Sequence, residues 1–180
     1  MSVTFRPFAM ADIAALQRWF QTEEDVLQWA GASMSYPVRT ADLKAIVRAH
    51  RKRDGQLEAW SMYRGDGQLC GHAQLWFDPR LHQATLGRVA IAPELRGQGL
   101  AALLIQDAVT RGFAPAWVNR LELRVYTHNA PAIAAYTRIG FSHEGTRRQS
   151  TPISQTYWDT AVMSLLREEY ERFDKRTERE

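Results

Sequence analysis

The segment from Val89 to Ile105 contains the residues whose types and spacing could do chemistry. It reads as a short apolar strand, a turn of small and polar residues, and an amphipathic helix, with Arg96, Gly97 and Gly99 where the turn becomes the helix. The start of a helix leaves backbone N–H groups without partners and carries partial positive charge. Glycines at such a start remove side chains, so that an anion can approach the backbone closely. The turn therefore predicts a site for a phosphate-bearing molecule, with the charge of Arg96 beside it.

Two nucleotide-binding patterns can be compared with this turn. Residues 97–102, Gly-Gln-Gly-Leu-Ala-Ala, match G-x-G-x-x-A, but in the dinucleotide fold the first glycine directly follows strand one. Here Pro93-Glu-Leu-Arg96 intervenes, hairpin strands come first, and Glu122 stands near the beginning of the next strand instead of at its end. The G-x-x-x-x-G-K-[ST] spacing of a P-loop is missing. NAD binding therefore stays as an alternative interpretation.

The rest of the chain alternates between helix and strand signals that would position this turn. Strands are predicted at 3–7, 57–64, 68–77, 84–92, 121–126, 141–147 and 156–164, with Gly65-Asp-Gly67 as a hairpin turn. Helices are predicted after the caps Asp12, Thr22 and Thr40, from the phosphate turn to about Arg111, from Asn129 to Gly140, and from Leu165 to Lys175. Residues 31–39 and 148–155 read as loops. The order predicts an α/β fold: one domain over 1–180, with a mixed central sheet of about six or seven strands flanked by helices.

A second element makes the first more specific. Arg96-Gly-Gln-Gly-Leu-Ala101 follows R/Q-x-x-G-x-G/A, and Asn129-Ala-Pro-Ala-Ile-Ala-Ala-Tyr-Thr-Arg-Ile-Gly-Phe141 begins further along the chain. Together these motifs resemble the GNAT family of acetyl-CoA-dependent N-acetyltransferases, most specifically over residues 84–145. Phe5-Arg-Pro-Phe, the pair Trp19 and Trp29, and the ending from Trp158 to Tyr170 look most like the branch that acetylates the N-termini of ribosomal proteins. That branch also contains enzymes for small amines.

The resemblance implies that acetyl-CoA is the cosubstrate. Its pyrophosphate would lie on the backbone amides of Arg96, Gly97, Gln98, Gly99, Leu100 and Ala101. The pantetheine arm would pair like an added strand with the central strand, which contains Val89, Ala90 and Ile91. An exposed N–H near Val89 or Ala90 would polarise the thioester carbonyl and hold the oxyanion. Gly87 is expected to mark the bulge that parts this strand from its neighbour.

Two residues of the second element each have two interpretations. Asn129 matches the family residue whose side chain bonds the pantetheine arm, and it is equally suited to capping a helix. Tyr136 matches the general acid that protonates the departing CoA thiolate, because a tyrosine pKa of about 10 suits a thiol of about 8.5. It also shares a helix face with Ile133, as a core tyrosine would.

The residue that deprotonates the amine is missing from its usual place. Family members often carry a glutamate on the central strand, near Thr85 or Arg88, but no acid occurs between Asp78 and Glu94. Substitutes are His72, His82, His128, Glu144 or a water relay. A weak base suits an α-amine, which at pH 7 needs about 3 kcal/mol less for deprotonation than a lysine. The acceptor is therefore predicted to be an α-amine, as at a protein N-terminus, or a similarly weak base.

Composition limits the remaining function classes. The 180 residues are 45% hydrophobic and 24% charged, as in ordinary globular proteins. A formal net charge of +3 suits a polyanionic cofactor and is too weak to argue for nucleic acid. The densest basic group is predicted to be the solvated side and end of a helix: Lys44, Arg48, His50, Arg51, Lys52 and Arg53.

Other signals concern location, metals and assembly. Cys70 is the one cysteine, which favours a cytoplasmic setting. The N-terminus has no apolar signal core, and no apolar run approaches the roughly 20 residues that span a bilayer. The five histidines are scattered, and no H-x-x-x-H or C-x-x-C occurs, so that no metal site is predicted. Monomer and homodimer both remain open.

Alternatives to an enzyme with an α-amine acceptor also follow from these residues. One is a catalytically silent acyl-CoA-binding module that has lost its base, and another is an enzyme for a small-molecule amine, such as a polyamine or an aminoglycoside-like compound. The early helices and the 31–39 loop would line the acceptor groove. Its aromatic candidates are Trp29, Tyr36, Trp60, Trp76, Tyr157 and Trp158.

Overall fold

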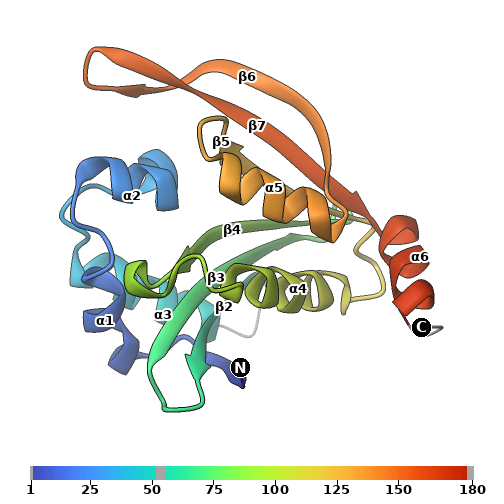
Figure 1. Cartoon of the computed structure of the whole chain (residues 1–180), viewed down its shortest axis with the longest axis horizontal. Helices are drawn as coiled ribbons and strands as arrows, with labels where there is room; N and C mark the ends of the chain where they lie inside the picture. The colour runs from blue at the N-terminus through green and yellow to red at the C-terminus, as the bar shows by residue number, and fades with distance from the viewer. Residues whose placement is uncertain (1, 52–55, 178–180) are drawn as a thin grey trace. The chain divides into compact units, whose positions relative to one another are not determined.

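In the described part of the chain, seven strands form one mixed sheet with the order β1-β2-β3-β4-β5-β7-β6 (β2 to β7 are labelled in Figure 1). The computed structural model describes residues 2–51 and 56–177, so that Lys52 and Arg53 of the basic group lie outside the described residues. The strands are β1 (Val3–Pro7), β2 (Leu57–Arg64), β3 (Leu69–Asp78), β4 (Gln83–Ile91), β5 (Arg120–Tyr126), β6 (Ser142–Ile153) and β7 (Thr156–Leu166). β4 and β5 are parallel, and β5–β7, β6–β7, β1–β2 and β2–β3 are antiparallel. The predicted α/β class with a mixed sheet flanked by helices is confirmed.

Among the described residues there are six α-helices and three short 3-10 helices, of which α6 follows the last strand and the others lie between strands. The α-helices are α1 (Ile13–Gln17), α2 (Glu23–Ala30), α3 (Thr40–Arg51), α4 (Leu100–Phe113), α5 (Ala130–Ile139) and α6 (Arg167–Thr177). The 3-10 helices are η1 (Met10–Asp12), η2 (Gly31–Ser33) and η3 (Pro93–Leu95). The chain divides into two compact units: unit 1 comprises Met1–Trp76 and Gly87–Leu104, and unit 2 comprises Phe77–Leu86 and Ile105–Glu180.

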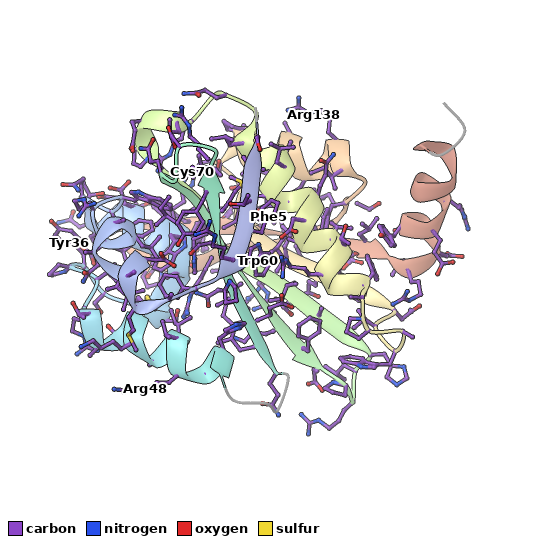
Figure 2. All side chains as sticks on the ribbon, turned by 90° about the horizontal axis from the view of Figure 1, so that it is seen from below. Phe5, Tyr36, Arg48, Trp60, Cys70 and Arg138 are labelled. Atoms are coloured by element: carbon purple, nitrogen blue, oxygen red, sulfur yellow. The ribbon has the colours of Figure 1, made fainter. Side chains whose placement is uncertain are left out.

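In unit 1, local signals in the sequence become turns and caps. Thr22 is the predicted cap of α2, and it forms a capping box with Asp25, because each side chain accepts from the other residue's backbone N–H. The β2–β3 hairpin turns at Gly65-Asp-Gly67, where Arg64 N–H donates to Gln68 O at 2.9 Å. Fully buried large side chains of this unit include Phe8, Leu16, Leu43, Trp60, Met62 and Leu75 (Trp60 is labelled in Figure 2).

Asp12 differs from its predicted role as a helix cap. At the start of α1 its side chain makes no capping hydrogen bond, and the residue is only 4% exposed. Its carboxylate instead accepts from Ala9 N–H at 2.9 Å, from Ser61 Oγ at 2.8 Å and from the Tyr63 hydroxyl. The carboxylate thus satisfies the Ala9 N–H at the start of η1, and the two hydroxyls on β2 supply its other hydrogen bonds.

In unit 2, α5 begins and ends where the sequence predicts. Asn129 is the N-cap, its Oδ1 accepts from Ala132 N–H at 3.3 Å, and the helix stops at Gly140, whose φ is 112°. The predicted loop at 148–155 is wrong, because β6 continues to Ile153 and pairs with β7 almost to the turn (Figure 1). β6 is an edge strand with mostly exposed residues, so its sequence is polar on both faces and resembles a loop.

Candidate active site

The predicted phosphate turn of unit 1 joins η3 to α4. Gly97 and Gly99 have φ values of 76° and 80°, and a Cβ at either would meet nothing within 4 Å. The glycines are therefore required by backbone conformation, and the space above them is open. Arg96 N–H bonds Pro93 O and Ala102 N–H bonds Gly99 O. Between them, the N–H groups of Leu100 and Ala101 belong to the first turn of α4, where a helix has no internal acceptors, and those of residues 97–99 lie in the turn that precedes it.

Arg96 holds its side chain close to the end of β4. Its Nε donates to Ile91 O at 3.4 Å, and residues 96–99 are all exposed while Leu100 is buried. Val89 and Ala90 are half-buried, and Ile91 is 9% exposed. A cation and a row of backbone donors thus stand at the turn that follows the central strand, which is the donor set that a pyrophosphate requires.

β4 changes its conformation in the middle. Its parallel register with β5 runs from Gln83, opposite Arg120, to Leu86, opposite Leu123. Arg88 then has a φ of 50°, an uncommon value for a residue with a side chain. A Cβ on Gly87 would lie 2.9 Å from Trp76 Cζ3, so the glycine is required by close packing. The bulge expected at Gly87 stays a prediction, and the left-handed backbone lies at the following residue, Arg88.

The Arg88 side chain and carbonyl are both held within unit 1. Trp29 Nε1 donates to Arg88 O at 2.8 Å, which ties α2 to the distorted point of β4. The guanidinium donates to Gln74 Oε1 at 3.0 Å and to Ser33 Oγ at 3.1 Å. Its central carbon lies 5.3 Å from the ring centroid of Trp76. The sequence analysis missed this arrangement, because nothing in the spacing of these residues shows that they meet.

His72 is unsuited to act as the missing base. The residue is 0% exposed, and burial, followed by the charge of Arg88, lowers its pKa to about 3. Its Nε2 lies 2.8 Å from Gln74 Nε2. A guanidinium only donates, so Gln74 must turn its oxygen to Arg88 and its NH₂ to His72. His72 Nε2 is thereby an acceptor, and its proton is on Nδ1.

The other substitutes for the base lie in unit 2. Arg120 holds Glu144 through two bonds of 2.6 and 2.5 Å, and these bonds with one from Ser164 lower the Glu144 pKa to about 2. A carboxylate so stabilised is a poor proton acceptor at neutral pH. His82 is exposed in the turn before β4, and His128 packs its ring on Tyr126 and Trp158 at centroid distances of 5.8 and 4.4 Å.

Tyr136 and Asn129 both lie on α5 or at its start. Tyr136 is 7% exposed, its ring packs edge-on against Phe141 at 5.7 Å, and burial raises its pKa. The phenol therefore keeps its proton at neutral pH, as a general acid must. Asn129 performs its capping role through Oδ1, and its amide group also carries two donors.

The candidate groove aromatics separate by exposure. Trp60 and Trp29 are 1% and 7% exposed and belong to the core, while Tyr36 and Tyr157 are 47% and 57% exposed (Tyr36 is labelled in Figure 2). Cys70 is buried, donates to Met62 O at 3.2 Å, and has its pKa raised to about 11 by burial, as expected of a structural cysteine. Among the described residues no group of three or more His, Cys, Asp and Glu is placed to hold a metal ion.

Comparison with known families identifies this arrangement. A model of the acetyltransferase (GNAT) family matches residues 18–141, which include the phosphate turn, β4 and α5. The chain belongs to the GNAT family. No helix in the described part of this GNAT protein is long and apolar enough to cross a membrane.

Two curated relatives show the range of the family around this chain. It is 34% identical over 89 residues to a [ribosomal protein bS18]-alanine N-acetyltransferase of Salmonella typhimurium, covering 47% of this chain and 57% of the relative. It is 30% identical over 105 residues to a spermidine N(1)-acetyltransferase of Escherichia coli, covering 58% and 56%. The chain thus spans less than two thirds of the length of these relatives.

A solved structure supports the fold over nearly the whole chain. The spermidine N-acetyltransferase from Vibrio cholerae, in complex with CoA and spermine, aligns with a TM-score of 0.81 at 22% identity. The alignment covers 94% of this chain and 98% of that one.

Proposed function

We propose that this protein is an acetyl-CoA-dependent N-acetyltransferase in which a primary amine attacks the thioester directly, in a ternary complex. The amine nitrogen forms a bond to the acetyl carbon, the carbon–sulfur bond breaks, and Tyr136 gives its proton to the departing thiolate. The excess proton on the amine leaves to water, and Tyr136 regains a proton from water, so that the phenol is neutral again after each turnover. The observation that carries the proposal is the turn at 96–101: two left-handed glycines, an exposed arginine and the first N–H groups of α4.

The residues of unit 1 fit acetyl-CoA in their chemistry. The phosphate groups need donors and positive charge, which residues 96–101 supply without a side chain at Gly97 or Gly99. The pantetheine arm needs backbone partners, and Val89, Ala90 and Ile91 would supply them by strand pairing. The distortion at Arg88 supports an N–H at Val89 or Ala90 that is available for the thioester carbonyl.

We further propose that the acceptor is the α-amine of a polypeptide N-terminus. No acid stands between Asp78 and Glu94, His72 has a pKa of about 3, and Glu144 has a pKa of about 2. None of these groups can accept a proton efficiently at pH 7. An α-amine, with a pKa of about 7.7–8.0, already has a useful neutral fraction, whereas lysine does not. The relative that acts on ribosomal protein bS18 supports this acceptor class.

A panel of acceptors tests this proposal. kcat/KM is measured with an alanine-starting peptide, the same peptide with a blocked N-terminus and an internal lysine, and spermidine. We expect at least a tenfold preference for the free α-amine at pH 7, since the lysine amine carries a deprotonation penalty of about 3 kcal/mol. kcat/KM should rise with pH and level off at about pH 8, where the α-amine is neutral, with no inflection from His72. A preference for lysine or spermidine would contradict the α-amine assignment.

The same missing base favours a second candidate, a silent module that binds acyl-CoA without turnover. Asn129 and Tyr136 at their expected positions on α5 argue against it. Tight acetyl-CoA binding with no CoA release on the whole panel would favour the silent module over the enzyme.

A further inference from the structure

Arg88 is a half-buried cation whose position is fixed from several directions. Within unit 1 its guanidinium contacts β3 through Gln74, η2 through Ser33, and lies over the rings of Trp29 and Trp76 at 5.9 and 5.3 Å. Long cationic side chains on a surface lose rotamer freedom when held in this way. These four contacts therefore hold the guanidinium in one place, which a role that needed only its positive charge would not require.

The support behind Arg88 extends into the core. Gln74 and His72 are both 0% exposed, and Gln74 is oriented by donating to His72 while accepting from Arg88. His72 Nδ1 is buried and has no hydrogen-bond partner among the described residues. A buried donor without a partner destabilises the folded state. The chain keeps this costly row of polar groups where an apolar core would be more stable, as proteins do where function requires it.

Arg88 lies beside residues to which the proposed function gives roles in binding acetyl-CoA and the acceptor. Arg88 precedes Val89, whose N–H is proposed to face the thioester carbonyl. Ser33 is the last residue of η2, within the 31–39 segment that is expected to line the acceptor groove. A guanidinium has five N–H donors, and the bonds to Gln74 and Ser33 use two of them. The nearby carboxylate of Asp42 is itself paired with Arg39 at 2.9 Å, so it does not cancel the charge of Arg88.

We infer that Arg88 is a specificity-determining residue: its guanidinium donates to the carbonyl oxygen next to the α-amine of a peptide acceptor and disfavours polycationic amines. A peptide N-terminus offers this carbonyl one carbon from the amine, and a polyamine has no carbonyl and carries further positive charges. The like charge of Arg88 raises the free energy of a bound polyamine, which provides discrimination by repulsion. This inference depends on the proposed acetyltransferase function.

The test compares three variants with the alanine-starting peptide and with spermidine. Arg88→Gln removes the charge, and Arg88→Lys keeps the charge but loses the planar fork of donors. Arg48→Gln is the matched control. Arg48 lies on α3 in the same unit, and its exposed side chain extends into solvent (Figure 2). Thermal unfolding of each variant reports whether it is folded.

The inference predicts a specific split between KM and kcat. Arg88→Gln should raise the KM for the peptide about tenfold to a hundredfold, the range for losing a hydrogen bond to a charged group, with a smaller change in kcat. The kcat/KM for spermidine should rise at least about threefold, which a loss of folding could not produce. Arg88→Lys should raise the KM for the peptide and keep the low kcat/KM for spermidine. Arg48→Gln should match the wild type with both acceptors.

Two results would overturn the inference, and they differ from failure of the proposed function. A decrease by the same factor for both acceptors in Arg88→Gln would show a purely structural role. Unchanged KM values in folded Arg88→Gln would show that the acceptor does not contact Arg88. If the wild type releases no CoA with any amine, the acetyltransferase proposal itself fails.

Discussion

At the scale of single residues, Tyr136 is the group whose chemistry is most directly testable. Tyr136→Phe removes the proton that we propose for the thiolate and keeps the ring that packs against Phe141. General acids contribute about 10²–10⁴-fold, so kcat should fall by about that factor. The Kd of acetyl-CoA, measured by calorimetry, should stay within about twofold. An unchanged kcat would show that Tyr136 is a core residue only.

Glu144 gives a second prediction at this scale, for stability against pH. Its pKa is lowered to about 2 in the folded protein by Arg120 and Ser164, so folding is favoured by its charged form. The stabilisation is present above the unfolded pKa of about 4.3 and is lost as pH falls toward 2. The difference in unfolding free energy between wild type and Glu144→Gln should therefore be constant above about pH 5 and shrink below about pH 4.3. A difference independent of pH across that range would contradict this pairing.

At the scale of elements, the role of the turn before α4 in binding acetyl-CoA can be distinguished from its contribution to stability. Gly97→Ala and Gly99→Ala should each cost about 1–2 kcal/mol of stability, because alanine is strained at positive φ. Both should also weaken acetyl-CoA binding about tenfold or more, since relaxing the strain turns the amides away from the phosphates. Denaturant unfolding and calorimetric titration measure the two effects.

Gly67→Ala is the matched control for that pair. Gly67 has a φ of 82° and open space above it, but it lies in the β2–β3 turn. It should lose the same stability and keep the wild-type affinity for acetyl-CoA. Equal losses of affinity in all three variants would show that the turn before α4 does not bind acetyl-CoA.

The elements also show why sequence reasoning succeeded where it did. The hairpin at Gly65-Asp-Gly67 and the capping box of Thr22 and Asp25 are local signals, which act between neighbours in the chain. The end of β6 was wrongly predicted as a loop because an exposed edge strand has the polar composition of a loop. The prediction of Asp12 as the cap of α1 was wrong because two of its hydrogen-bond partners, Ser61 and Tyr63, come from β2, about 50 positions away. No local pattern in the sequence shows these contacts.

The residues of the candidate site also divide into those that local motifs predict and those that only the folded structure brings together. Gly97, Gly99 and Asn129 could be placed from motifs, because their roles depend on local backbone. The cluster around Arg88 could not, because His72 and Gln74 on β3, Ser33 in η2 and Arg88 on β4 meet only in three dimensions. The sequence showed only that no glutamate stands near Thr85 or Arg88, whereas the structure shows which side chains surround Arg88.

At the scale of the whole molecule, we propose that residues 1–180 form one domain. β3, β4 and α4 each continue from one compact unit into the other. Unfolding should therefore be one cooperative transition, with coincident curves from near-ultraviolet and far-ultraviolet circular dichroism. Acetyl-CoA at about 100 times its Kd should stabilise that single transition by about 2.7 kcal/mol. Two separated transitions would show independent domains.

The central claim is acetyl transfer from acetyl-CoA to an α-amine, and release of the CoA thiol with an alanine-starting peptide tests it most directly. The assay uses the full chain at pH 7 to 8, with the N-terminally blocked peptide as the control. The account predicts release in proportion to peptide acetylated at the α-amine, and none with the blocked peptide. Acetyl-CoA that binds without any thiol release would contradict it, and would instead indicate a module that binds the acyl carrier.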